Sequence, residues 1–178
     1  MPDGYDIGLA RADELAALPA IERAAATVFA PADLTPTAAA QCQPLSFFED
    51  AMEAGRLWVV RATEPPVPVG FAAATLVDGS AHLQEMDVQP DHARKGLGRA
   101  LVEEVRSWAH NAGFAWLTLT TFRHLEWNAR FYARLGFVEI PAEAVGPELR
   151  AILDDEAAQG LEPGQRVAMQ LALAARQA

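Results

Sequence analysis

Cysteine is almost absent from this chain, since Cys42 is the only one among 178 residues. One cysteine cannot form an internal disulfide or a thiolate metal cluster. The sequence has four histidines, and none of them forms a His-x-x-x-His pair, the spacing that binds zinc on one face of a helix. We therefore expect no metal site.

Long apolar runs are also missing. No window of 18 or more apolar residues occurs, so we expect no membrane-spanning segment and no membrane partner. Residues 1–6 are acidic and lack the basic and apolar regions of a signal peptide. These features together favour a cytoplasmic location.

Positive charge is scarce. The chain has 14 Lys and Arg residues against 24 Asp and Glu residues, which gives a net charge of −10. Sequence-independent binding of nucleic acid needs clustered cations against phosphates, so we expect no nucleic-acid partner. A negative field favours the approach of cationic substrates, but it also serves solubility alone, and the composition does not separate the two.

The length fits one domain, and no internal repeat or change of composition divides it, so we expect a single domain over 1–178. Apolar periodicity and turn residues predict the order β-α-α-β-β-β-α-β-α-β-α-β. The expected fold is α/β, with a mixed, mostly antiparallel sheet of about seven strands flanked by helices. The expected strands are 5–10, 56–63, 67–77, 81–88, 114–121, 137–140 and 166–173. The expected helices are 19–30, 46–54 (capped by Ser46), 97–112, 128–135 and 147–158.

The segment before the longest helix has the features of an anion site. A strand ends, a short loop follows, and the helix begins at a Gly-x-Gly pair, Gly96 and Gly98. Glycine lets a ligand approach the backbone closely, and the first N–H groups of a helix have no partner within it. Arg94, Lys95 and Arg99 add positive charge where it opposes the helix dipole, a conflict that a bound polyanion removes.

Two common phosphate motifs do not fit this loop. A P-loop needs Gly-x-x-x-x-Gly-Lys-Ser/Thr, which the sequence lacks. A dinucleotide fingerprint needs a small residue where Leu101 stands, and an acidic residue about 20 positions later, where the sequence around Thr118 is neutral. The anion is therefore expected to belong to another class of ligand.

A second segment, 127–137, has two adjacent helical faces. Trp127, Phe131 and Leu135 follow i, i+4, i+8 spacing and are expected to pack inward. Asn128 and Tyr132 share the neighbouring stripe, so one amide and one phenol would point the same way. Tyr132 equally fits a structural position at the edge of the core, with its hydroxyl hydrogen-bonded to water.

Together these segments resemble the GNAT superfamily of N-acetyltransferases. One part of the resemblance is Glu-Met-Asp-Val-Gln-Pro at 85–90 followed by Arg-Lys-Gly-Leu-Gly-Arg-Ala-Leu at 94–101. The other is Asn-Ala-Arg-Phe-Tyr-Ala-Arg-Leu-Gly-Phe at 128–137. One departure is Ala93, which stands where the family often has Gln or Arg, so a side-chain contact to phosphate is lost there.

The resemblance implies acetyl-CoA as co-substrate, held where the strand at 86–88 splays from the strand at 117–121. The Val88 N–H would polarise the thioester carbonyl, and the N–H groups at 94–99 would hold the pyrophosphate. The cofactor-binding residues it implies are Met86, Asp87, Val88, Arg94, Lys95, Gly96, Leu97, Gly98, Arg99 and Asn128.

The implied reaction is direct attack of an amine on the thioester. A Lys-like amine has a pKa near ~10.4, so its deprotonation at pH 7 costs about 4–5 kcal/mol. Glu85 is the expected base, with Asp87 the weaker rival, and burial would have to raise the pKa of Glu85. Tyr132 would protonate the departing thiolate as general acid.

The predicted function is acetyl-CoA-dependent N-acetylation of a primary amine on a small molecule or peptide. The alternative is a non-catalytic acyl-CoA sensor or interaction domain of the same fold, and O-acylation or a longer acyl donor would keep the fold too. Residues 30–48, 123–127 and 142–163 are expected to line the acceptor pocket. The stretch 142–163 also suits a homodimer contact.

Overall fold

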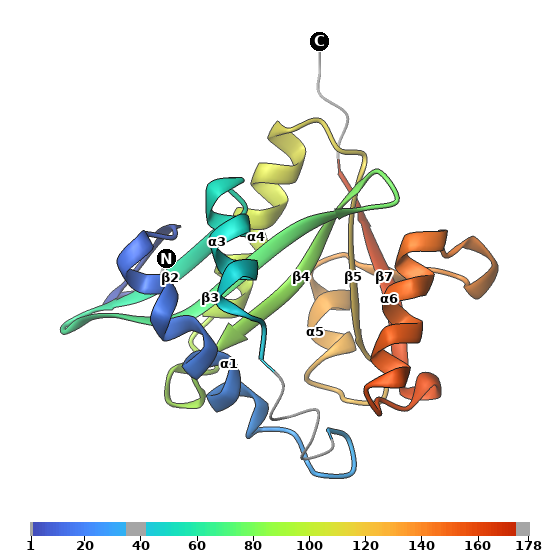
Figure 1. The fold of residues 1–178 in the computed structure, drawn as a ribbon, viewed down its shortest axis with the longest axis horizontal. Helices are drawn as coiled ribbons and strands as arrows, with labels where there is room; N and C mark the ends of the chain where they lie inside the picture. Colours follow the sequence, from blue (N-terminus) through green and yellow to red (C-terminus); the bar gives the residue numbers. More distant parts are fainter. Residues whose placement is uncertain (1, 35–41, 174–178) are drawn as a thin grey trace. The chain divides into compact units, whose positions relative to one another are not determined.

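A computed structural model describes residues 2–34 and 42–173 of the chain. Seven strands form one mixed sheet in the order β1-β2-β3-β4-β5-β7-β6 (Figure 1). The strands are β1 (Tyr5–Leu9), β2 (Leu57–Thr63), β3 (Pro66–Val77), β4 (Ser80–Val88), β5 (Trp116–Phe122), β6 (Val138–Glu139) and β7 (Arg166–Ala172). Neighbours are antiparallel in β1–β2, β2–β3, β5–β7 and β6–β7, whereas β4 and β5 are parallel. The expected fold class is confirmed.

The α-helices are α1 (Leu18–Ala26), α3 (Leu45–Glu53), α4 (Leu97–Asn111), α5 (Ala129–Arg134) and α6 (Pro147–Ala158). Short 3-10 turns occur at η1 (Ala12–Ala17), η2 (Pro90–His92), η3 (Ala142–Ala144) and η4 (Pro163–Gln165). The chain forms two compact units. Unit 1 comprises Met1–Thr75 and Leu83–Ser107, and unit 2 comprises Leu76–His82 and Trp108–Ala178.

Unit 1 has its core on one face of β2 and β3. Ile21 of α1 and Phe48 of α3 are almost fully buried there with Val59 and Phe71 of the strands. The rings of Phe48 and Phe71 meet edge to face at 5.2 Å, an arrangement that aromatic quadrupoles favour. Apolar residues therefore recur at helical spacing on α1 and α3 and at every second position on β2 and β3, and together they form one apolar layer.

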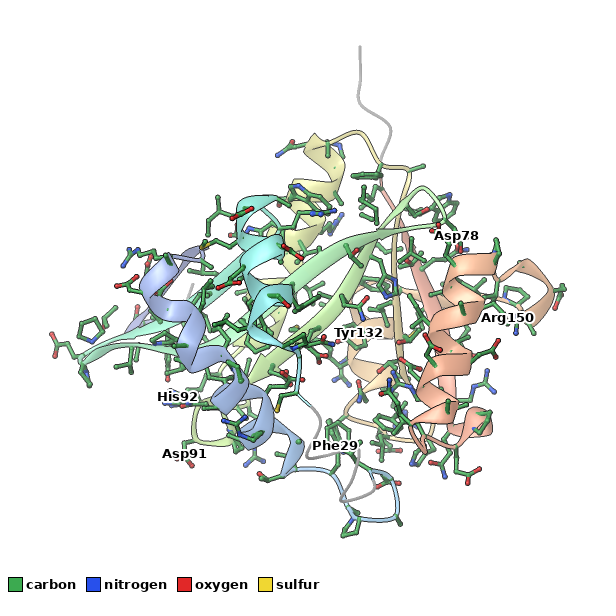
Figure 2. All side chains as sticks on the ribbon, in the orientation of Figure 1. Phe29, Asp78, Asp91, His92, Tyr132 and Arg150 are labelled. Atoms are coloured by element: carbon green, nitrogen blue, oxygen red, sulfur yellow. The ribbon has the colours of Figure 1, made fainter. Side chains whose placement is uncertain are left out.

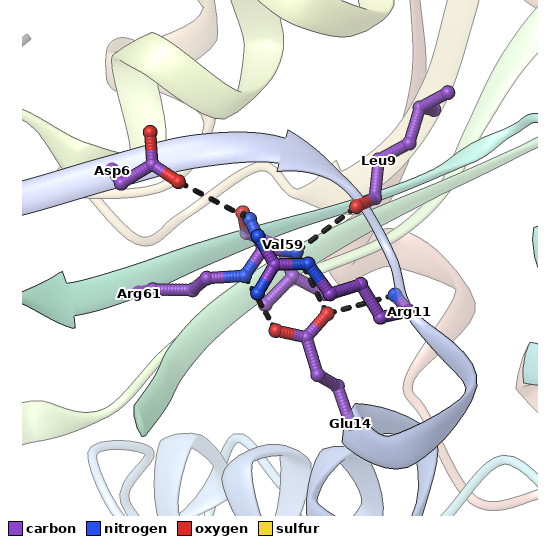
Figure 3. Close-up of polar contacts among 6 residues, drawn as sticks. All are labelled: Asp6, Leu9, Arg11, Glu14, Val59 and Arg61. Carbon is purple, nitrogen blue, oxygen red and sulfur yellow. Dashed lines mark hydrogen bonds and ion pairs between the residues drawn. The ribbon is translucent and has the colours of Figure 1, made fainter. Parts of the chain in front are cut away.

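An ion pair fastens η1 to β2 at a register shift after Val60 (Figure 3). Arg61 donates from Nε to Glu14 Oε1 at 2.5 Å and from Nη2 to Glu14 Oε2 at 2.7 Å. Its Nη2 also donates to the carbonyl oxygen of Leu9 at 2.9 Å, and Asp6 lies 3.6 Å from Nη1. Burial opposes the charge of Glu14, but the hydrogen bonds and charge of Arg61 leave the pKa of Glu14 below its ordinary value.

Unit 2 packs α6 on its strands. Leu149 of α6 is buried with Val77 of β3 and Ala168 of β7. Asp78 has a φ of +50° in the turn after β3, and its carboxylate accepts the N–H groups of Glu148 and Leu149 at 3.0 Å each. It therefore caps α6 from a distant part of the chain; Figure 2 labels Asp78, together with Arg150 on that helix.

The predicted boundaries need small corrections. Ser46 does not cap α3, because the helix already begins at Leu45 after an extended Pro44. The first helix begins at Leu18 and ends at Ala26, because η1 forms the preceding turn and separate turns follow it. In the described parts of the chain no helix is both long enough and apolar enough to span a membrane.

Candidate functional site

The predicted anion loop lies in unit 1 between β4 and α4. Arg94 and Gly96 have left-handed backbones, with φ of +59° and +83°, and this turns the chain into α4 at Leu97. The Ala100 N–H donates to Gly96 O at 3.1 Å. The N–H groups of Leu97, Gly98 and Arg99 precede it in the first turn, where a helix offers no carbonyl partner. The local geometry thus provides the row of N–H groups that an anion site needs.

The three cations of this loop, Arg94, Lys95 and Arg99, are all exposed. Lys95 Nζ donates to the hydroxyl of Tyr5 at 2.9 Å and lies 5.5 Å from the centre of the Tyr5 ring. The Tyr5 hydroxyl also lies 2.9 Å from Nδ1 of His92, which Figure 2 labels in the turn before the loop. A residue of β1 therefore positions the Lys95 side chain. This contact could not be predicted from the sequence, because Tyr5 and Lys95 are 90 positions apart.

The end of β4 lies tightly against β3. The Gln89 N–H donates to Val69 O at 2.9 Å, and because backbone groups alternate along a strand, the Val88 N–H points away from β3. A Cβ placed on Gly70 would lie 2.7 Å from Asp87 O and 3.1 Å from Val88 Cγ2. Only glycine permits this approach. Gly70 was not among the predicted site residues, although a glycine inside a strand is a signal for close backbone contact.

The side chains of β4 alternate between two faces. Glu85 and Asp87 point one way, and Met86 and Val88 point the other. The two carboxyl groups are hydrogen-bonded, and the pKa of Asp87 is well above its ordinary value because of burial, then the charges of Glu85 and Glu22, and that hydrogen bond. Asp87 Oδ2 is buried without a hydrogen-bond partner among the described residues. Glu22, on α1, is a further member that sequence reasoning missed, since a glutamate on an amphipathic helix carries no signal of its own.

In unit 2, Asn128 stands just before α5, with φ of −110° and ψ of −84°. Its carbonyl oxygen accepts the Tyr132 N–H at 3.3 Å, and its side-chain Oδ1 accepts the Thr121 hydroxyl at 2.5 Å. Asn128 and Tyr132 therefore lie one turn apart, as predicted. With Oδ1 in use, the amide has its N–H₂ donors left for another acceptor.

The predicted inward face of α5 is wrong. Trp127 is 49% exposed, and Phe131 and Leu135 are only partly buried, whereas Tyr132 is 8% exposed. Trp127 precedes the helix in a turn, so helical spacing does not apply to it. The Tyr132 ring packs edge to face against Phe131 at 5.0 Å and Phe137 at 5.7 Å (Tyr132 is labelled in Figure 2). Tyr132 is thus a packed residue with a polar tip.

The predicted site residues fall into two groups, and each unit holds one group together. Unit 1 carries Glu85, Met86, Asp87 and Val88 on β4 and all six residues of the loop 94–99, whereas unit 2 carries Asn128 and Tyr132. In unit 2, β4 pairs with β5 through Ala81↔Leu117 and His82↔Thr118. Within 2–34 and 42–173, no three His, Cys, Asp or Glu side chains form a group suited to a metal ion.

Comparison with known proteins agrees with the two motifs. Residues 20–137 match the acetyltransferase (GNAT) family, and this span is more than half of the sequence. The chain therefore belongs to the acetyltransferase (GNAT) family, and the predicted GNAT superfamily N-acetyltransferase is confirmed.

Solved structures share the fold at low identity. The ribosomal-protein-S18-alanine N-acetyltransferase of Escherichia coli is 20% identical, with a TM-score of 0.64 over 97% of this chain and 96% of that one. The PaiA N-acetyltransferase of Thermoplasma acidophilum, in complex with coenzyme A, is 14% identical, with a TM-score of 0.63 over 94% and 98%. Arabidopsis thaliana Naa50, with a bisubstrate analogue, is 15% identical, with a TM-score of 0.63 over 95% and 99%.

Proposed function

We propose that residues 1–178 form a single-domain, acetyl-CoA-dependent enzyme that transfers acetyl to a primary amine of a small molecule or peptide. The observation that carries this proposal is the loop at 94–99 in a GNAT family member. Its left-handed Gly96, its glycine in the first turn of α4 and its three exposed cations fit a pyrophosphate. Two of the similar structures contain coenzyme A or an analogue built on it, which supports the same choice of ligand.

The residues have distinct roles in binding. The N–H groups from Arg94 to Arg99 (including those of Lys95, Gly96, Leu97 and Gly98) hold the pyrophosphate. The edge of β4 at Met86–Val88 pairs with the pantetheine arm through its backbone, beyond the two residue pairs with β5. The Asn128 amide donates its N–H₂ to the cofactor, because its oxygen already accepts from Thr121. Asp87 lies between Met86 and Val88 on this strand, and because backbone groups alternate, its own N–H and carbonyl point toward β3.

The chemistry needs a base, an oxyanion donor and an acid. Acetyl-CoA supplies an acetyl group activated as a thioester. Glu85 accepts the proton that the acceptor ammonium must lose before its nitrogen attacks. The Val88 N–H, which points away from β3, donates to the carbonyl oxygen as negative charge develops on it. Tyr132 donates its hydroxyl proton to the departing sulfur and regains a proton from solvent.

To test this proposal, the protein is incubated with acetyl-CoA and a panel of amines. Turnover is measured by the release of free thiol, and the acetylated product is identified by its mass. Wild-type turnover is expected, with a fall of about a hundredfold in kcat for Tyr132→Phe, the scale of a lost proton donor. Gly98→Glu is the matched binding variant. It places a carboxylate in the first turn of α4, so it should abolish coenzyme A binding by calorimetry and keep the circular dichroism spectrum.

The possible results separate the alternatives. Coenzyme A binding without turnover on any amine would indicate a sensor and contradict the enzymatic proposal. No binding of coenzyme A at all, or unchanged affinity in Gly98→Glu, would contradict the assigned pyrophosphate site. A cytoplasmic location and a homodimer contact through 142–163 stay predictions; fractionation and light scattering test them.

A further inference from the structure

Three carboxyl groups of unit 1 act on one another. Glu85 and Asp87 lie on the same face of β4, and Glu22 comes from α1. The charges of Glu85 and Glu22 both raise the pKa of Asp87, after the larger effect of burial. The causes of this shift, which are burial and the two neighbouring carboxyl groups, all raise the pKa of Asp87.

A hydrogen bond joins Glu85 and Asp87. Two ionised carboxylates cannot hydrogen-bond each other, so the pair holds one proton. Asp87 is the more enclosed of the two and its pKa is raised, so it keeps the shared proton and donates it in the hydrogen bond to Glu85. The pair then carries one negative charge, located mainly on Glu85.

The described residues supply no hydrogen-bond donor to Asp87 Oδ2. This oxygen is nonetheless buried. Leaving such an oxygen without a donor is unfavourable, and native proteins seldom do so away from functional sites. A donor supplied by a ligand beside Glu85 would complete its hydrogen bonding.

Glu22 offers a second negative charge. Its two carboxylate oxygens accept the Gln43 N–H at 3.1 and 3.0 Å, which fixes the side chain. Burial raises the pKa of Glu22, and the Gln43 hydrogen bond and the charge of Arg23 only partly oppose this. Arg23 itself points to Cys42, with Nη1 3.6 Å from Sγ. A cation near Glu22 would therefore stabilise its charged form.

The number of negative charges on these three carboxyl groups indicates which class of amine accepts the acetyl group. Glu85 and Asp87 share one negative charge, which suits the ammonium that reacts, and Glu22 adds a second negative charge. We propose that Glu22, Glu85 and Asp87 form the acceptor site, and that the acceptor is a small diamine whose reacting nitrogen lies at Glu85 and Asp87 while its second ammonium faces Glu22. This inference rests on the proposed function, and the net charge of −10 favours the approach of such a dication.

The first experiment compares 1,4-diaminobutane with butylamine as acceptors. Wild-type kcat/KM is expected to favour the diamine by at least about tenfold, since a charge pair contributes on the order of 1.4 kcal/mol or more at a partly buried site. Glu22→Gln should reduce this preference to less than about threefold, mainly through KM. The matched control is Glu103→Gln, which removes an exposed carboxylate on α4 paired with Arg106 and should leave the preference unchanged.

A second variant tests the shared proton. In Asp87→Asn a neutral amide replaces a neutral acid and still donates to Glu85, so the pKa of Glu85 should stay close to its wild-type value. The acid limb of kcat/KM against pH is therefore expected to move by less than about half a unit. Glu85 and Glu22 are the charged groups that act on position 87, and Glu22→Gln removes a negative charge, so it should move the limb to lower pH. A limb that moves to lower pH by about one unit or more in Asp87→Asn would overturn the assignment, because residue 87 would then carry the negative charge in the wild type.

Binding without turnover separates this inference from the proposed function. Calorimetry should show 1,4-diaminobutane binding to the wild type, and weaker binding in Glu22→Gln, even in the absence of acetyl-CoA. Equal kcat/KM for the two amines in the wild type would overturn the diamine site while leaving N-acetylation intact. Equally strong binding of Mg²⁺ alone would also overturn it, because the site would then select charge without the spacing of two nitrogens.

Discussion

His82 is a buried titratable residue that the proposed reaction does not use. It is 1% exposed in unit 2, and its Nδ1 lies 2.8 Å from the Thr118 hydroxyl. That hydroxyl donates to Ala81 O at 3.3 Å, so Nδ1 of His82 carries the proton and donates to Thr118. Burial lowers the pKa of His82 to about 4, and the charge of Glu156 opposes this only in part.

His82 should make stability depend on pH. The folded protein holds the ring neutral, whereas the unfolded chain protonates it near pH 6.5. Its contribution is therefore complete above pH 6.5 and is lost as the pH falls toward 4. The gap corresponds to about 3 kcal/mol in the free energy of unfolding. Urea titrations at pH 4.5, 5.5 and 7 would measure the free energy of unfolding, which should change less with pH in His82→Gln than in the wild type. An equal dependence of this free energy on pH in the two proteins would contradict the prediction.

At the scale of elements, η1 is attached to β2 through Glu14 and Arg61. Both side chains are nearly buried, at 8% and 7% exposed. A buried ion pair contributes little net stability compared with apolar residues, but removal of one partner leaves an uncompensated charge. The pair therefore fixes where η1 begins rather than adding a large favourable energy.

Glu14→Ala should lower the free energy of unfolding by about 3 kcal/mol, because the guanidinium of Arg61 stays buried without its carboxylate. Asp6→Ala is the matched control. Asp6 is also within 3.6 Å of Arg61, but its side chain is 62% exposed, so its loss should cost less than about 1 kcal/mol. Denaturant unfolding at pH 7 measures both, and similar losses for the two variants would contradict the importance of burial.

At the scale of the whole molecule, the two units share their regular elements. The boundaries between the units fall inside β3, β4 and α4, so each of these elements contributes to both. Breaking an element at such a boundary would lose its own backbone hydrogen bonds. The units are therefore expected to unfold together, in keeping with the proposed single domain.

Equilibrium unfolding in urea should show one transition. Circular dichroism at 222 nm and tryptophan fluorescence are expected to give the same midpoint, since Trp58 lies in unit 1 and Trp108, Trp116 and Trp127 lie in unit 2. Separate midpoints, or a fluorescence change that precedes the loss of helix, would contradict the single cooperative domain.

The sequence by itself determined the features that depend on neighbours along the chain. Helical spacing and the glycines placed α4 and the loop at 94–99, and α6 was predicted at Pro147–Ala158, as observed. The order of strands and helices and the two motifs led to the family, which the comparison confirmed. These are local properties, because periodicity, turn residues and helix starts are set within a few residues.

Only the tertiary structure decided the contacts between distant segments. Asp78 caps α6 across 70 positions, Tyr5 holds Lys95, and Glu22 comes near Asp87 from another element. The same holds for Tyr132, whose burial depends on Phe137 beyond the end of α5 rather than on spacing within the helix. Burial and the partner across the fold set the state of a polar group, and neither is written in the residues beside it.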